Sequence, residues 1–205
     1  MGTYLTNVEK DFFLNTLNFS KCTMACDIGA GAGKFSLLAT QRGVDVVAID
    51  IDSQGLKRLK SKSNLVNVVL ADAKSIPLKE ATVDAAFMIE VLDYIPELGT
   101  VLGECSRILK DGGSLVFSFG NEASLKSKLR QLQGKHYMHS HRSVVQSLDD
   151  VKLQIVKTEG FNWLPFNRTS ENRSIPWLAK AEKLLRLRKI RRFSPWVLIY
   201  AVKLK

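Results

Sequence analysis

The sequence predicts an α/β fold in which a mostly parallel sheet carries helices on both faces. Three observations support this prediction. Short runs rich in Val, Ile and Ala alternate with segments of helical periodicity between Thr23 and Phe119. A glycine turn, residues 29–33, joins the first run to the first helical segment. Acidic residues follow several runs, and the carboxyl ends of parallel strands meet at one edge of a sheet, where ligands bind.

Composition indicates one ordinary domain with an excess of positive charge. The 205 residues are 45% hydrophobic and 24% charged, which is typical of a globular chain. The three cysteines, Cys22, Cys26 and Cys105, form no paired framework, so we expect reduced thiols without a catalytic role. We expect neither a targeting leader nor a membrane span, and therefore a cytoplasmic protein. The net charge of +10 favours an acidic substrate, a nucleic acid or an anionic membrane surface, without choosing among them.

The elements follow in order from periodicity and turn residues. An amphipathic helix is expected from Val8 to Leu17, ahead of the strand that begins at Thr23. The later strands are expected at 44–50, 66–70, 85–89, 114–119, 151–158 and 195–204. Helices are expected at 34–41, from a cap at Ser53, from Pro96 to Leu109, and at 121–133, 143–148 and 177–192.

The glycine turn predicts a nucleotide-like site. A side chain at Gly29 or Gly31 would block a ligand or forbid a positive φ, and the helix that follows presents free N–H groups. A dinucleotide fingerprint requires glycine where Lys34 stands. A Walker phosphate loop requires a longer gap that ends in Gly-Lys-Ser/Thr. The G-x-G-x-G spacing fits neither.

This turn resembles the first motif of the class I S-adenosylmethionine-dependent methyltransferases, an acidic residue two positions before G-x-G-x-G. Asp27 and the three glycines match that motif. The likeness extends over residues 23–119 and includes the turn 107–113, where Asp111 replaces the family's proline. It implies the small-molecule group of type 11 and a Rossmann-like, doubly wound, seven-stranded sheet whose last strand pair is antiparallel. The cofactor implied is S-adenosyl-L-methionine.

The resemblance also implies which residues hold the cofactor. Asp50 would bind both ribose hydroxyls, although an incidental acidic loop residue is the alternative. Asp72 would accept from the adenine amino group while the backbone N–H of Ala73 meets a ring nitrogen. The cofactor-binding set is Asp27, Gly29, Ala30, Gly31, Gly33, Asp50, Ile51, Asp72, Ala73 and Glu90.

The fourth strand leads to the expected reaction centre. The family often carries a His-His or similar pair where this chain has Asp93 and Tyr94. Asp93 could act as a base and Tyr94 could orient the substrate, but a polar residue here can also serve only to cap a helix.

Three histidines fall within six residues further along the chain. His139 and His141 are candidate bases, and His136 is a candidate substrate residue. A plain connector is the alternative for this loop. No neighbouring acidic or cysteine ligand completes a metal set, so no metal is expected.

The chain divides into an N-terminal helical cap (1–20), a cofactor-binding core (21–120) and a substrate-side half (121–205) with a basic helix near 177–192. On that helix Trp177, Leu184 and Leu185 share an apolar face that ends where the arginines begin. Residues 180–192 could meet an anionic membrane surface or a phosphate-bearing substrate, or lie in solvent as a charged cap. Nucleic acid is disfavoured because no aromatic side chain stands between the arginines.

The expected function is methyl transfer to a small-molecule, quinone-like, lipid-linked or sugar acceptor by a cytoplasmic enzyme that can lie at the membrane periphery. No Asn-Pro-Pro-Tyr-type segment follows the fourth strand, which argues against methylation of amino groups on bases or glutamine. The alternatives are an RNA or protein methyltransferase and a non-catalytic module that retains the fold. A nicotinamide dehydrogenase is disfavoured because it would need glycine at Lys34.

Overall fold

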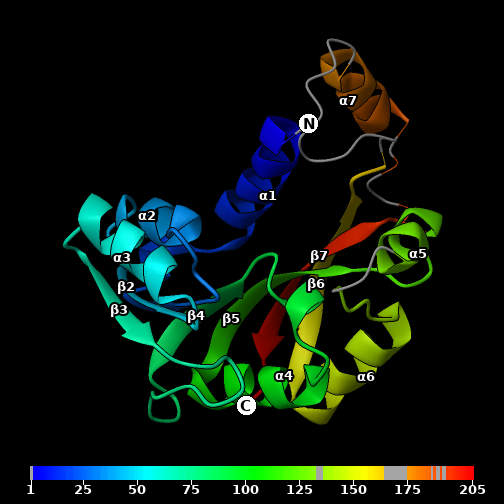
Figure 1. Ribbon diagram of the computed structural model, residues 1–205. Coiled ribbons are helices and arrows are strands. Elements are labelled where there is room, and N and C mark those ends of the chain that lie inside the picture. The colour runs from blue at the N-terminus through cyan, green and yellow to red at the C-terminus, as the bar shows by residue number, and fades with distance from the viewer. Residues whose placement is uncertain (1, 133–135, 164–174, 186, 188–189, 191–192) are drawn as a thin grey trace.

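A computed structural model describes residues 2–132, 136–163, 175–185, 187, 190 and 193–205 (Figure 1). It contains a seven-stranded sheet of order β3-β2-β1-β4-β5-β7-β6. The strands β1 to β5 run parallel, and β7 pairs antiparallel with both β5 and β6. The strands are β1 Met24–Ile28, β2 Asp45–Asp50, β3 Val66–Leu70, β4 Val83–Met88, β5 Leu109–Gly120, β6 Leu153–Phe161 and β7 Trp196–Lys203. The predicted fold class, including the antiparallel last pair, is confirmed.

Helices cover both faces of the sheet, as a doubly wound fold requires (Figure 1). Side chains of α4 and α6 pack in one hydrophobic cluster, and side chains of α1, α2 and α3 pack in the other. The helices are α1 Gly2–Thr16, α2 Lys34–Thr40, α3 Ser53–Lys62, α4 Leu98–Ile108, α5 Leu125–Leu132, α6 His141–Asp150 and α7 Ile175–Leu184, with short 3-10 turns at Phe19–Lys21 and Leu92–Tyr94.

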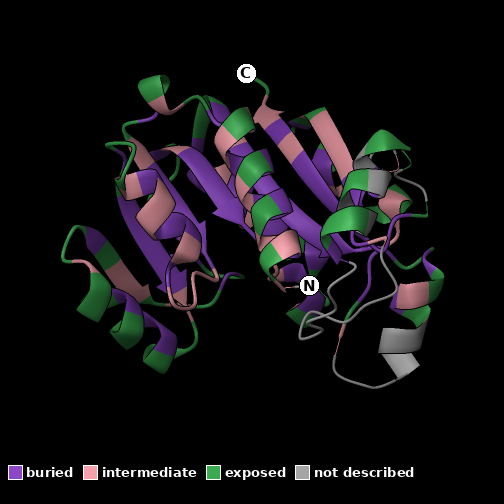
Figure 2. Ribbon diagram, turned by 90° about the horizontal axis from the view of Figure 1, so that it is seen from above, coloured by how far each residue is buried: buried purple, intermediate pink, exposed green. Residues whose placement is uncertain are grey.

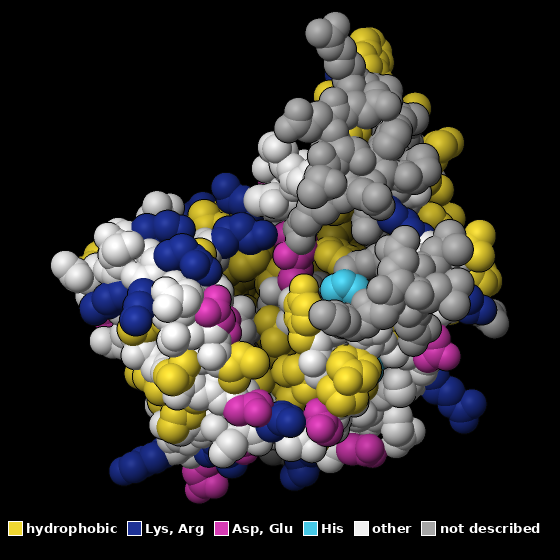
Figure 3. Space-filling model, viewed as in Figure 1, with side chains coloured by type: hydrophobic (Ala, Val, Ile, Leu, Met, Phe, Trp, Pro, Cys, Tyr) yellow, Lys and Arg dark blue, Asp and Glu magenta, His cyan; other side chains and the backbone are white. Residues whose placement is uncertain are grey.

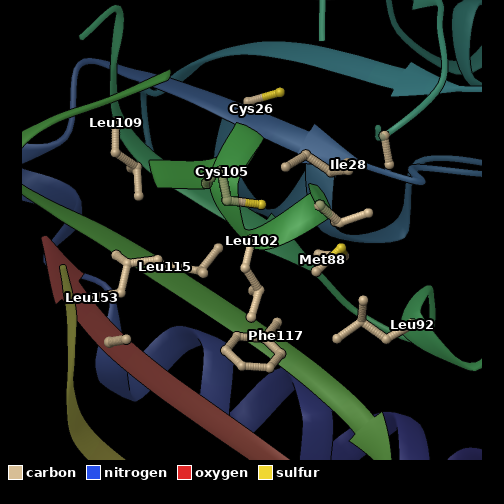
Figure 4. Packing of buried hydrophobic residues seen from close by; sticks show 14 of the residues in the cluster. Cys26, Ile28, Met88, Leu92, Leu102, Cys105, Leu109, Leu115, Phe117 and Leu153 are labelled. Atoms are coloured by element: carbon tan, nitrogen blue, oxygen red, sulfur yellow. The ribbon is translucent and has the colours of Figure 1, made fainter. Parts of the chain in front are cut away.

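The central strands are buried on both faces, which explains why they read as continuous apolar runs (Figure 2). In the hydrophobic cluster that contains α4, Leu102 and Cys105 of this helix lie over Phe117 of β5 (Figure 4). Burial raises the pKa of the Cys105 thiol to about 12, so this thiol stays protonated at neutral pH.

The N-terminal helix α1 is part of the hydrophobic core. Phe13 is fully buried, and its ring centroid lies 5.2 Å from that of Phe35 and 5.0 Å from that of Phe87. On the same helix Glu9 is fully buried and accepts from Lys34 Nζ at 3.0 Å. The helix is therefore fixed directly to the segment that follows the glycine turn.

The structure corrects three details of the sequence analysis. Asp52, not Ser53, caps α3, because its carboxylate accepts from the backbone N–H of Gln54 at 2.9 Å. The strand predicted at 151–158 is β6, which begins at Leu153 and continues to Phe161. Helix α7 ends at Leu184 and does not continue through 192; residues 186, 188–189 and 191–192 lie outside the described part of the chain.

The predicted apolar face of α7 is exposed at the residues that the structure describes, although Ile175 of the same helix is buried in a core cluster. The exposed fraction is 76% for Trp177, 83% for Leu184 and 66% for Leu185. Within the described residues, no helix combines the length and the apolar character needed to cross a bilayer.

Candidate active site

The three glycines of the turn adopt positive φ angles of 69°, 52° and 79°, which only glycine adopts without strain. A Cβ added at Gly29 would lie 2.4 Å from Val91, and one at Gly33 would lie 2.1 Å from Leu59. A Cβ added at Gly31 meets nothing within 4 Å. Two of the glycines are therefore required for packing within the chain, and Gly31 alone faces open space.

Asp27 holds the start of α2. It is buried and accepts hydrogen bonds from the backbone N–H and the hydroxyl of Ser36. Burial raises the pKa of Asp27 to about 7, although the bonds from Ser36 oppose that rise. Asp27, the acidic residue of the motif, thus helps to fix the position of α2, the helix that follows the turn.

Asp50 stands at the carboxyl end of β2 and ties the turn to the next loop. Its Oδ2 accepts from the backbone N–H of Gly31 at 2.7 Å, and its Oδ1 accepts from the N–H of Asp52 at 2.7 Å. Each carboxylate oxygen has a second lone pair, so both oxygens keep the capacity to accept from a ligand. These two bonds fix the direction of the carboxylate.

A cavity of about 840 Å³ opens along this edge of the sheet, a volume in the range of small-molecule sites. Figure 3 shows the hollow at the centre of the face, with acidic and hydrophobic side chains along it. Of the predicted cofactor residues, Gly29, Gly31, Asp50, Ile51, Asp72, Ala73 and Glu90 line the cavity. Asp27, Ala30 and Gly33 lie outside the lining.

The cavity lining is acidic in a chain that is basic overall. Its charged members are Asp50, Asp52, Asp72, Glu90, Glu97 and Lys74. The Lys74 Nζ lies 3.5 Å from Glu97 and 3.9 Å from Asp72, so this cation of the described lining is shared between two of the carboxylates. The lining as a whole is suited to a positively charged ligand. Lys74 was missed by the sequence analysis, where no motif marks it.

Arg107 fixes the loop that carries Asp72 and Ala73. Its guanidinium donates to the carbonyl oxygens of Leu78 at 2.7 Å and Ile76 at 2.8 Å, and it forms an ion pair with Glu104 at 2.6 Å. Glu104 in turn accepts from the N–H of Ile76 at 2.7 Å. The hydrogen bond from Arg107 is the main reason that the pKa of Glu104 lies below its usual value.

The segment after β4 forms the apolar part of the cavity. Val91, Tyr94, Ile95 and Pro96 line it, and Tyr137 joins them from the loop that precedes α6. The side chains of Tyr94 and Tyr137 are 64% and 47% exposed, so both are accessible to a ligand. Tyr137 is a further lining residue, and no motif in the sequence marks it.

Asp93 lies away from the cavity. It is buried, and its Oδ1 accepts from the backbone N–H of Gly120 at 2.9 Å. Its carbonyl oxygen accepts from the N–H of Tyr137 at 2.8 Å. These bonds join the end of β5 and the histidine loop to the segment after β4, which is a positioning role.

The structure separates the three histidines. His139 is buried with its Nε2 3.2 Å from the carbonyl oxygen of Leu92, and His141 is the first residue of α6. None of the three histidines is among the lining residues of the cavity. The ring centroid of His136 lies 5.5 Å from that of the cavity residue Tyr94. No group of three or more potential metal ligands occurs within the described ranges.

Comparison with known proteins matches residues 26–117 to a family described as a methyltransferase domain. This segment contains the glycine turn, Asp50, Asp72 and the apolar part of the cavity after β4. Residues 26–117 of the chain are thus similar to a methyltransferase domain.

Relatives of this chain include enzymes named for two different acceptors. The chain is 29% identical to the malonyl-[acyl-carrier protein] O-methyltransferase of Methylococcus capsulatus and 27% identical to the ubiquinone biosynthesis O-methyltransferase of Alkalilimnicola ehrlichii. Each match covers 82% of this chain and 64% of the relative. The chain thus spans less than two thirds of the length of these curated relatives.

Solved structures of other methyltransferases share the fold. An S-adenosylmethionine-dependent methyltransferase from Mesorhizobium loti matches with a TM-score of 0.74 and 16% identity, over 95% of this chain and 97% of that one. Geranyl diphosphate C-methyltransferase from Streptomyces coelicolor matches with a TM-score of 0.75 and 18% identity, over 98% and 81% of the two chains. That structure contains S-adenosyl-L-homocysteine.

Proposed function

We propose that this methyltransferase domain transfers the methyl group of S-adenosylmethionine to an uncharged, largely apolar small-molecule acceptor. The observation that carries the proposal is the cavity itself. It runs from Asp72 and Asp50, past Gly31, to the tyrosines Tyr94 and Tyr137. One cavity thus offers a polar end for a nucleoside and an apolar end for an acceptor.

The residues of the polar end fit the cofactor. S-Adenosylmethionine carries a sulfonium and an ammonium group, and five of the six charged residues of the lining are acidic. Asp50 would accept from the ribose hydroxyls, and Asp72 from the adenine amino group. Gly31 leaves open the space that a Cβ would fill. When bound, the cofactor supplies an activated methyl group, and the chain's part is to align the acceptor and remove its proton.

The same acidic lining favours an uncharged acceptor. A phosphate or carboxylate would face the carboxylates of Glu90 and Glu97, with Lys74 as the only cation among the described lining residues. A malonyl group carries such a carboxylate, so of the two acceptors for which the relatives are named, a quinone-like one fits better. Both relatives are O-methyltransferases, and we favour oxygen as the acceptor atom.

We assign the proton acceptor to His136. Its ring lies edge-on to Tyr94, and its Nδ1 is buried without a hydrogen-bond partner in the described part of the chain. Asp93 and His139, which are buried and form hydrogen bonds to the backbone of other segments, would act by holding the loop in place. A base of this kind contributes about 10²- to 10⁴-fold to the rate for a hydroxyl acceptor.

The test is a methyl-transfer assay with labelled S-adenosylmethionine against a phenolic quinol, a malonyl thioester and a phosphate-bearing alcohol. We expect label on the quinol alone, and a loss of at least about 10²-fold in kcat for His136→Gln with cofactor affinity unchanged. Transfer only to an anionic acceptor would overturn the acceptor class. Cofactor binding without transfer to any small molecule would favour the non-catalytic module.

A further inference from the structure

In helix α7 large apolar side chains face solvent, whereas an ordinary surface helix turns its apolar face toward the core. Ile175 and Glu182 lie seven residues apart, hence on one helical face, and both are buried. Trp177 and Leu184 share the opposite face and are 76% and 83% exposed. The helix therefore turns Trp177 and Leu184 away from the body of the protein, where a partner outside the chain could cover them.

Further apolar side chains continue this surface after the helix ends. Leu185, Ile190 and Phe193 are 66%, 45% and 56% exposed. In Figure 3 hydrophobic side chains stand uncovered at the top of the molecule, where Figure 1 places α7. We call Trp177, Leu184, Leu185, Ile190 and Phe193 the apolar ridge. Isolated exposed apolar residues need no explanation, but several large ones in one short stretch of the chain indicate an interaction site.

The charge around the ridge identifies its partner. Lys180 lies on the same helical face, with its Nζ 5.5 Å from the centroid of the Trp177 ring. The sequence places five Arg and Lys residues between 186 and 192, and no Asp or Glu follows Glu182. In contact with a second copy of this chain, these cations would face the same cations of that copy and repel them. Nucleic acid would leave the aliphatic leucines unburied.

We propose that the apolar ridge inserts into the interface of an anionic lipid bilayer. Trp and Leu side chains flanked by Lys and Arg are the composition of helices that lie in the plane of a membrane surface. The apolar side chains would enter the acyl boundary while the basic residues meet the headgroups. This inference goes beyond the proposed function and does not depend on it, because vesicle binding requires neither cofactor nor acceptor.

Sedimentation with vesicles tests the inference. We expect binding to phosphatidylcholine mixed with phosphatidylglycerol, weaker binding to phosphatidylcholine alone, and partial reversal by salt. Leu184→Asp should weaken the partition about tenfold or more, and Lys180→Gln about fivefold. The matched control is Leu65→Asp, because Leu65 is 73% exposed in the loop between α3 and β3 at the far end of the sheet. That variant should bind as the wild type does.

Tryptophan fluorescence tests whether the contact with the membrane lies at the apolar ridge. Of the three tryptophans Trp177 is highly exposed and Trp196 is buried, so a blue shift on vesicle addition that disappears in Trp177→Phe supports insertion. The proposal fails if the folded wild type does not bind the mixed vesicles, or if the Leu184→Asp and Leu65→Asp variants bind them equally. Concentration-dependent dimerisation lost in Leu184→Asp, without vesicle binding, would assign the ridge to a second copy instead. Salt-sensitive RNA binding alone would assign it to nucleic acid.

Discussion

Replacing Gly31 and Gly33 separately by alanine should divide the glycine turn into a ligand-facing and a packing position. The two residues have comparable φ angles of 52° and 79°, so the backbone strain on a Cβ is similar, about 1–2 kcal/mol in each variant. Only at Gly33 does the new Cβ also meet a neighbour, at 2.1 Å from Leu59 Cδ1. Leu59 is fully buried in α3 and cannot move freely, so overpacking adds about 1–3 kcal/mol.

We therefore expect Gly33→Ala to lower the free energy of unfolding by about 2–5 kcal/mol, and Gly31→Ala by about 1–2 kcal/mol. Binding should show the reverse order. The Gly31 variant places a methyl group in the cavity and should weaken S-adenosylhomocysteine about tenfold or more, whereas the folded Gly33 variant should bind nearly as the wild type does.

Urea unfolding and titration calorimetry measure the two effects. Equal losses of stability in the two variants would refute the packing argument at Gly33. Unchanged affinity in Gly31→Ala would refute the assignment of Gly31 to the ligand side.

Three further predictions concern residues that position the site. Burial raises the pKa of Asp27 from 3.8 to about 7, so the folded state holds this proton more tightly than the unfolded state, and stability falls as the pH rises through that range. Asp27→Asn should abolish that fall, and the difference in unfolding free energy between variant and wild type should grow by on the order of 4 kcal/mol from pH ~4 to pH ~7. A difference that stays constant with pH contradicts the role given to burial. Arg107→Met should cost about 2–4 kcal/mol of stability in urea unfolding, because two carbonyl oxygens and Glu104 lose a charged donor, and adenine affinity should fall with it. Unchanged stability would show that the loop holds without the guanidinium. Asp93→Ala should lower the melting temperature and leave the N–H of Gly120 unpaired at a cost of about 1–3 kcal/mol, whereas His136→Gln should leave stability intact. The opposite pattern would contradict the positioning role given to Asp93.

The sequence was sufficient for the order of elements because each local signal agreed with the sheet. Alternation of apolar runs and helical stripes requires parallel crossovers, and Asp50, Asp72 and Glu90 then fall at one edge. These three residues do line one cavity.

What the sequence could not show depends on contacts between distant segments. Glycine spacing alone does not reveal that Gly33 faces Leu59 while Gly31 faces the cavity. Asp93 is polar and stands after the right strand, but the hydrogen bond to Gly120, 27 residues away, turns its carboxylate from the cavity. Tyr137 reaches the lining from another loop, and no motif marks it.

What covers the apolar face of α7 could not be predicted from the sequence, for a different reason. Periodicity shows that Trp177 and Leu184 share a face, but it does not show whether a core of the same chain or an external partner covers that face. The exposed fractions of these two residues decide the matter, and they require the folded structure.

A crystal structure with S-adenosylhomocysteine tests the central claim most directly. We predict the ligand in the cavity at the carboxyl edge, with its ribose hydroxyls on Asp50, its adenine at Asp72 and the N–H of Ala73, and its sulfur toward Tyr94 and Tyr137. Crystals soaked to saturation that hold the ligand elsewhere, or a wild-type protein that calorimetry shows does not bind it, would contradict the account.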